Sequence, residues 1–113
     1  MTTRRYLLHT ASAPDGAALE VEVPTTHRQR ARGLIGRPPV PMLFERARSV
    51  HTFGMREAID VAFLDRDLRV IRVTTVPPHR IVWSMRARHV LELPAGSELQ
   101  RGDRLATAPG ASR

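Results

Sequence analysis

Residues that could do chemistry are concentrated between positions 51 and 65. His51, Arg56 and Asp60 lie just before and inside the apolar run 59–64, in which Asp60 is the one polar residue. A carboxylate in an otherwise dry strand needs a partner. Arg56 and His51 are the nearby candidates, so we expect Asp60 to pair with one of them. Such a pair would either anchor the fold or line a site for a ligand.

Arginine is the second residue type that could bind something. A guanidinium group offers paired donors for a carboxylate or a phosphate. Arg32 and Arg80 therefore join His51, Arg56 and Asp60 as candidate ligand-binding residues, with Arg28 as a further possibility. For each arginine the alternative is a solvated side chain.

The charge balance is strongly basic, but its origin can be simple. The formal net charge is +7, the pI is about 11.6, and all 18 basic residues are Arg. A chain without Lys or Asn fits a GC-rich genome, and such a bias would scatter arginines over the surface. Nucleic-acid binding is an unfavoured alternative, because aromatic residues do not alternate with the basic ones and no helix-turn-helix is visible.

Catalytic and metal-binding patterns are weak. The five His residues show no His-x-His or His-Glu-x-x-His spacing, and there is no Cys. His51 with Asp60 and Asp65 is the one set that strand pairing could bring to a metal. Ser49, His51 and Asp60 could form a hydrolase triad, but no Gly-x-Ser-x-Gly elbow surrounds the serine. We therefore assign no catalytic residue, metal ligand or cofactor.

Apolar and alternating runs predict a series of short strands. Turn signals at 13–16 and 65–67 should each close a hairpin. Pro77 and Pro78 should end the pairing of the strand before them, and 79–87 shows no readable pattern. The strands are expected over 6–10, 19–23, 42–44, 59–64, 68–73, 89–93 and 105–107.

One short helix is expected between the second and third strands. Thr26 and Gln29 match a capping box, in which each side chain accepts a hydrogen bond from the other residue's backbone. Gly33 should end the helix, and Leu34 should dock it onto the sheet. The fold class is therefore mostly β: a compact β-sandwich or partly closed barrel with one short helix.

The length of 113 residues predicts one domain over 1–113, with 108–113 as a frayed tail. No apolar run is long enough for a signal peptide or a membrane span, so we expect a cytoplasmic protein. We also expect it to be a monomer or a weak dimer.

The favoured function is a non-enzymatic binding or accessory module for a small anionic ligand or an acidic protein segment. The alternatives are a small hydrolase or metal-dependent enzyme near His51 and Asp60, and a weak nucleic-acid binder.

Five blocks of sequence together resemble the domain of unknown function 192 family. They are TTHRQRARGL at 25–34, PMLF at 41–44, IDVAFLD at 59–65, VLELPAG at 90–96 and GD at 102–103. The resemblance implies a β-rich domain with one short helix, and no settled activity.

One part of the chain departs from the family's pattern. Many relatives carry an aromatic-Met-Lys-Asn-Thr run and a longer spacer before the acid, whereas here Phe53-Gly54-Met55-Arg56 leads almost directly to Asp60. Met55 and Asp60 match the pattern and Arg56 preserves the charge, but the Asn and Thr positions have no match. His51 is the candidate to replace those polar groups.

Overall fold

The computed structural model describes residues 1–108. Of the predicted tail at 108–113, Ala108 is buried and the other five positions lie outside the described residues. Within residues 1–108, no helix has the length and apolar character needed to cross a membrane.

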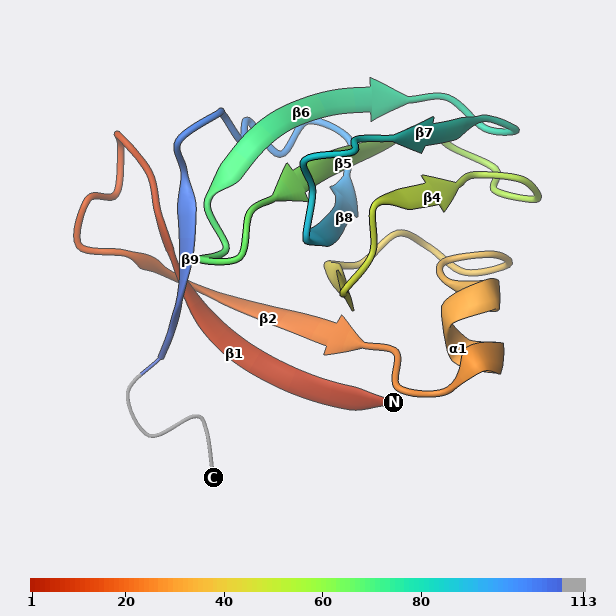
Figure 1. The fold of residues 1–113 in the computed structure, drawn as a ribbon, viewed down its shortest axis with the longest axis horizontal. Coiled ribbons are helices and arrows are strands. Elements are labelled where there is room, and N and C mark those ends of the chain that lie inside the picture. The colour runs from red at the N-terminus through yellow and green to blue at the C-terminus, as the bar shows by residue number, and fades with distance from the viewer. Residues whose placement is uncertain (109–113) are drawn as a thin grey trace.

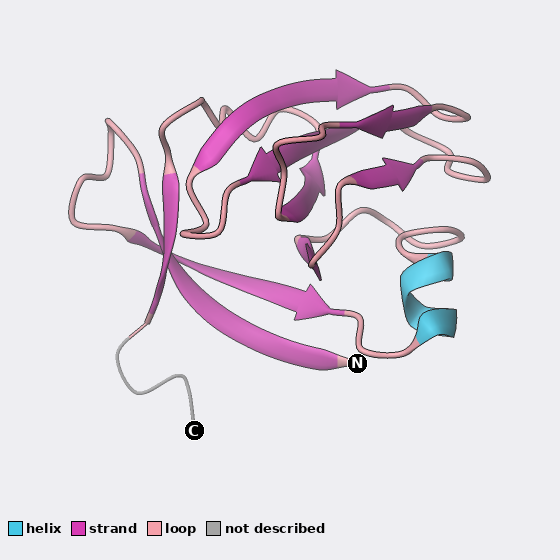
Figure 2. Cartoon of the chain, viewed as in Figure 1, coloured by secondary structure: helices cyan, strands magenta, loops and turns pink. Residues whose placement is uncertain are grey.

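Strands dominate the described chain, as predicted (Figures 1 and 2). Seven of them form one sheet in the order β6-β5-β8-β3-β2-β1-β9, and two form a small second sheet, β4-β7. The elements are β1 (Thr2–His9), β2 (Ala17–Val23), α1 (His27–Arg32), β3 (Met42–Glu45), β4 (Ser49–His51), β5 (Ile59–Leu64), β6 (Val70–Val76), β7 (Ile81–Trp83), β8 (His89–Pro94) and β9 (Arg104–Thr107).

The large sheet curls until its two edge strands meet at one corner. An antiparallel bridge joins Arg69, just before β6, to Arg104 of β9. The backbone N–H of Val70 donates to the Asp103 carbonyl at 2.7 Å, and the N–H of Gly102 donates to the Val70 carbonyl at 2.8 Å. Of the two predicted architectures, the partly closed barrel is the one adopted.

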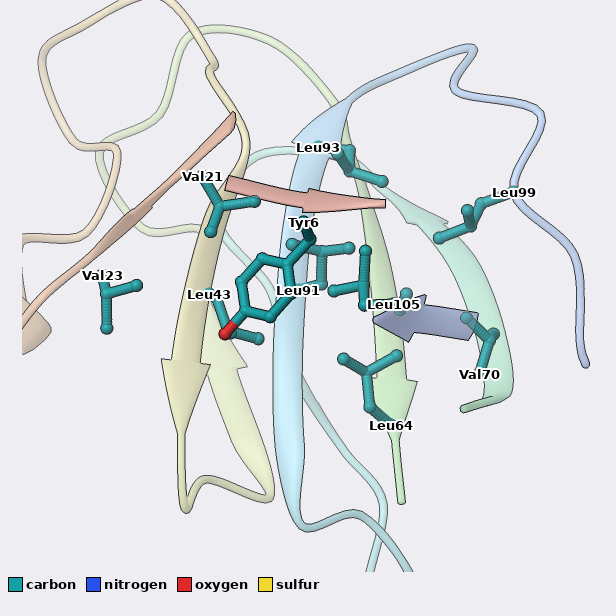
Figure 3. Close-up of a cluster of buried hydrophobic side chains, with 11 residues drawn as sticks. Tyr6, Val21, Val23, Leu43, Leu64, Val70, Leu91, Leu93, Leu99 and Leu105 are labelled. Atoms are coloured by element: carbon teal, nitrogen blue, oxygen red, sulfur yellow. The ribbon is translucent and has the colours of Figure 1, made fainter. Parts of the chain in front are cut away.

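The inside of the curl holds the first of two hydrophobic cores. Figure 3 shows its side chains, with the Tyr6 ring among leucines and valines from both halves of the sheet. Its buried members are Tyr6, Val21, Val23, Leu43, Ala62, Leu64, Val70, Leu91, Leu93, Leu99 and Leu105.

The second core lies on the opposite face of strands β3, β5 and β8. The β4-β7 sheet and the segment after α1 supply side chains to it, including Val50 and Leu34. Because β5 lies between the two cores, all six of its residues are buried. This explains why its sequence is a nearly continuous apolar run rather than an alternating one.

The predicted helix is confirmed with its capping box. The Thr26 hydroxyl accepts a hydrogen bond from the Gln29 N–H at 3.1 Å, and the Gln29 side chain accepts one from the Thr26 N–H at 3.3 Å. The helix itself buries no side chain. Leu34, just beyond it, is buried in the second core and holds this segment against the sheet.

The predictions about strands were wrong at three points. β1 begins at Thr2 rather than at residue 6, because Thr2 to Arg5 also pair with β2. β6 continues through Val76 instead of leaving the sheet at position 74, because its residues from Thr74 to Val76 pair with β5 and Pro77 comes only after the strand. β4 and β7 were not predicted, since each has only three residues and their pairing joins distant parts of the chain, with Val50 opposite Val82.

Candidate functional site

A pocket of about 420 Å³ opens between α1, the loop after it and the β4-β7 sheet. Buried apolar side chains form much of its wall, and exposed residues form its mouth. Its lining consists of Arg30, Ala31, Arg32, Gly33, Leu34, Ile35, Phe44, Ala47, Ser49, Val50, His51, Met55, Ile81 and Glu92. The volume lies in the range typical of small-molecule sites.

Glu92 is the buried acid of this pocket. It lies in the middle of β8, opposite Met42 of β3 and Val61 of β5, so apolar residues flank it on both sides. Its relative exposure is 2%. Its Oε1 atom is buried and has no hydrogen-bond partner, and the structure shows no ion pair to Glu92 within residues 1–108.

Burial decides the protonation of this carboxyl group. Removal from water disfavours the charged form, and no nearby cation offsets that effect. Burial therefore raises the pKa of Glu92 from its ordinary 4.5 to about 8. At neutral pH the side chain is mostly a neutral acid that can donate one hydrogen bond and accept others.

Gly33 lets the chain pass close to this carboxyl group. Its φ of 52° and ψ of −126° form a conformation that side chains rarely adopt, and its N–H closes the helix on the Gln29 carbonyl at 2.9 Å. A Cβ atom here would lie 3.3 Å from Cζ of Phe44 and 3.9 Å from Oε1 of Glu92. A side chain at this position would therefore crowd Phe44 and stand beside the unpaired oxygen.

Basic residues surround the mouth of the pocket. Arg30 donates a hydrogen bond from Nη1 to the Glu45 carbonyl at 2.9 Å, which holds the Arg30 side chain against β3. Arg32 is exposed and makes one long contact, at 3.4 Å, from Nε to the Ile35 carbonyl. His51 is exposed, and its Nδ1 accepts a hydrogen bond from the Phe53 N–H at 3.2 Å. The mouth therefore carries positive charge while the interior is apolar with one neutral acid.

The structure brings two of the five predicted site residues to this pocket, Arg32 and His51. Arg56 lines a separate hollow of about 160 Å³ beside the proline-rich segment. Arg80 is exposed and contacts the backbone oxygen of His79 at 3.3 Å. Asp60 faces the other side of the sheet.

Asp60 has different partners from those predicted. Its Oδ2 accepts hydrogen bonds from the Ser97 N–H at 3.0 Å and the Ser97 hydroxyl at 2.6 Å, and its Oδ1 accepts one from the Thr75 hydroxyl at 2.7 Å. The predicted pairing with Arg56 or His51 was therefore wrong. Alternation places Asp60 on the barrel side of β5, where hydroxyl groups from β6 and from the loop after β8 reach it.

These contacts also set the charge of Asp60. Burial alone would raise its pKa, but the hydrogen bonds from Ser97, Thr75 and the Gly96 backbone outweigh that effect and hold the pKa below its ordinary value. Asp60 is thus an ionised acid that fastens the loop after β8 to β5 and β6.

The imagined triad and metal set are not assembled. Ser49 and His51 lie at the pocket mouth, while Asp60 is bound to Ser97 and Thr75. No group of three or more His, Cys, Asp or Glu side chains in residues 1–108 is arranged to hold a metal ion.

Sequence reasoning missed Glu92 as a site residue. In the run His89-Val90-Leu91-Glu92-Leu93, alternation places Glu92 with Val90 and away from Leu91 and Leu93. An acid on that face is ordinarily solvated. The available sign was the apolar Val90 on the same face, which the structure shows to be buried.

Comparison with known proteins identifies relatives over most of the chain. The model of the DUF192 family, described as "Uncharacterized ACR", matches residues 9–107. A UPF0127 protein of Pyrococcus horikoshii is 39% identical over 85 residues, which cover 68% of this chain and 74% of that protein. A UPF0127 protein of Pyrococcus abyssi is 35% identical over 85 residues, covering 68% and 73% of the two chains.

Two crystal structures share the fold. A protein of Sinorhizobium meliloti 1021, provisionally described as a transcription regulator, superposes with a TM-score of 0.78 at 30% identity and covers 92% of each chain. A protein of unknown function from Novosphingobium aromaticivorans superposes with a TM-score of 0.76 at 19% identity. The alignment covers 89% of this chain and 82% of that protein. The second likeness concerns the fold alone.

Proposed function

Because the chain belongs to the DUF192 family, whose description assigns no activity, we propose its function from the pocket itself. The protein is a non-enzymatic binding module for a small amphipathic anion. The ligand has an anionic group at the pocket mouth, an apolar body against the walls, and a neutral hydrogen-bonding group, such as a hydroxyl or carbonyl, at its inner end.

The observation that carries this proposal is the buried, unpaired carboxyl group of Glu92. A buried polar group without a partner costs about 1–3 kcal/mol, and proteins keep few of them. Glu92 is one of the residues that line the pocket. A ligand atom that accepts a hydrogen bond from the O–H of this neutral acid supplies the missing partner.

The walls and the mouth favour the rest of the ligand. Leu34, Phe44 and Met55 are buried wall residues and suit an apolar body. Arg32 and Arg30 at the mouth suit a carboxylate or another anion, because guanidinium groups bind such groups with paired hydrogen bonds. An anion placed at the inner end instead would lie beside Glu92 and disfavour its ionised form further.

The test uses two ligand panels of matched chain length, plain alkyl carboxylates and ω-hydroxy carboxylates. Binding is followed by NMR chemical-shift changes and by the shift in thermal unfolding. We expect the hydroxy compounds to bind about tenfold more tightly than the plain ones, corresponding to one additional buried hydrogen bond. The affinity of both panels should fall above about pH 8, because an ionised Glu92 repels the carboxylate of the ligand.

Three variants separate the parts of the site. Glu92→Leu should abolish the preference for hydroxy compounds while plain carboxylates still bind. Arg32→Gln should weaken both panels several-fold, and Arg28→Gln, on the same helix but outside the pocket lining, should not. Shifts that map away from the pocket, or a hydroxyl preference that survives Glu92→Leu, contradict the proposal.

A further inference from the structure

A second hollow, of about 450 Å³, has four arginines among its seven lining residues. Its residues are Arg46, Ala47, Arg48, Arg66, Ala87, Arg88 and His89. We propose that this arginine hollow is a separate binding site for a small phosphate-class anion, such as a diphosphate or the phosphate group of an ester.

Backbone hydrogen bonds hold the arginine hollow together. The Ala47 N–H donates to the Arg88 carbonyl at 3.1 Å, and the Arg88 N–H donates to the Leu64 carbonyl at 2.8 Å. The Ser84 N–H donates to the Arg48 carbonyl at 2.9 Å. These bonds join the loops after β3, after β5 and before β8 at one end of the sheet. The four guanidinium groups therefore gather from three loops whose main chains are fixed to one another.

The arginines of the hollow lack acidic partners. In residues 1–108 the ion pairs are made by Arg4, Arg5 and Arg37, each with a glutamate, and none involves an arginine of the hollow. Like charges brought together in this way repel one another and destabilise the compact state. Arg48 also donates from Nε to the Ala87 carbonyl at 3.2 Å. A multiply charged anion offsets the repulsion, and a genome bias towards arginine does not explain why four arginines without an acidic partner share one concave surface.

Glu45 and Asp65, the two acids whose charges act on His89 of the hollow, are already engaged. Glu45 is bound by Arg4 at 2.9 Å and 3.3 Å. Asp65 accepts hydrogen bonds through Oδ1 from the backbone N–H groups of Asp67 at 2.8 Å and Arg69 at 3.0 Å, within the turn after β5. Neither carboxylate forms an ion pair with the hollow.

His89 adds a neutral donor to the cations. Its Nδ1 lies 3.1 Å from the backbone nitrogen of Arg46 and accepts that hydrogen bond. Burial lowers the pKa of His89; the charges of Arg46 and Arg88 act in the same direction, and those of Glu45 and Asp65 oppose it without outweighing it. The neutral ring therefore carries its proton on Nε2, where it can donate to an anion.

The chemistry of the lining separates this site from the pocket of Glu92. Apart from the arginines and His89 the lining holds only two alanines, so it offers little surface to an apolar body. No Phe, Tyr or Trp ring lines it, whereas stacking on aromatic side chains is the usual means of holding nucleic-acid bases. A compact, highly charged group such as a phosphate suits the hollow better than either an amphipathic carboxylate or a nucleic-acid strand.

The experiment titrates the full chain with pyrophosphate, with acetate, and with a single-stranded DNA oligomer, followed by calorimetry and NMR. The test variant is Arg66→Gln with Arg88→Gln; both side chains are exposed, and the loop bonds of Arg88 use only its backbone. The control is Arg28→Gln with Arg101→Gln, which removes the same net charge from exposed positions outside the hollow. All four substitutions leave the lining of the Glu92 pocket unchanged.

We expect pyrophosphate to bind the parent and the control alike, and to lose about tenfold or more in affinity for the test variant, because two charge-assisted contacts are removed. Acetate should bind far more weakly. Three results overturn the proposal: no pyrophosphate binding to the parent at low salt, equal losses in the test and control variants, or an oligomer that binds much more tightly than pyrophosphate and loses affinity in both variants. The last two would indicate a diffuse charge effect.

Discussion

Replacing Glu92 with glutamine should change how stability depends on pH. The folded-state pKa of Glu92 is raised from 4.5 to about 8, so between these values the folded protein holds a proton that the unfolded chain has released. Stability therefore decreases as pH rises through this window, by about 1.4 kcal/mol per unit and about 5 kcal/mol in all. A glutamine side chain cannot ionise, so the Glu92→Gln variant should lack this decrease.

The measurement is urea unfolding of the parent and of Glu92→Gln across the window. From about pH 5 to about pH 9 the stability of the variant relative to the parent should rise by about 4 kcal/mol. A buried amide without partners lowers the stability of the variant by an amount that does not depend on pH, so the slope and not the offset is diagnostic. Glu57→Gln, at an exposed glutamate, is the control and should follow the parent. Parallel curves for the parent and Glu92→Gln would refute the reasoning, because they would mean that Glu92 ionises in the folded protein as easily as in the unfolded chain.

Two further predictions concern the framework of the fold. Asp60→Ala should cost about 2–4 kcal/mol at neutral pH, because the donors of Ser97 and Thr75 lose a charged acceptor. The pKa of Asp60 is lowered in the folded state, so its contribution to stability is present at neutral pH and is lost as the pH falls through the folded-state pKa. Urea unfolding should therefore show a smaller difference between the parent and Asp60→Ala at acid pH than at neutral pH. A variant as stable as the parent at neutral pH would contradict this prediction. Thr26→Ala should cost about 1 kcal/mol in thermal unfolding, because the Gln29 N–H loses its capping acceptor. An unchanged melting temperature would mean that the cap contributes nothing to the folded state.

Composition alone allowed two explanations of the many arginines, a genome bias and a role in binding, and the two predict different distributions over the surface. A genome bias predicts scattered side chains, yet Arg46, Arg48, Arg66 and Arg88 line a single hollow. They are dispersed in the sequence over three loops. Composition could account for their number, but their convergence depends on the pairing of β3, β5 and β8, whose ends carry those loops.

Local sequence determined most of the framework, because its signals act over a few residues. The apolar run 59–64 became the doubly buried strand β5, and Thr26 with Gln29 began the helix as expected. The three-residue strands β4 and β7 could not be predicted in this way. Each has an exposed residue at both ends, and their pairing comes from contact between segments about thirty residues apart.

The identity of the important acid was decided only by the tertiary structure. Sequence drew attention to Asp60, the acid within the more apolar strand, and alternation correctly placed it on the face opposite to that of Ile59 and Val61. It could not show that hydroxyl groups of Ser97 and Thr75 would satisfy that carboxylate. Nor could it show that Glu92 would be left without a partner. Period-two alternation assigns a side chain to a face of a strand, but whether that face meets water, a hydroxyl group or the bare backbone of Gly33 depends on which distant segment covers it.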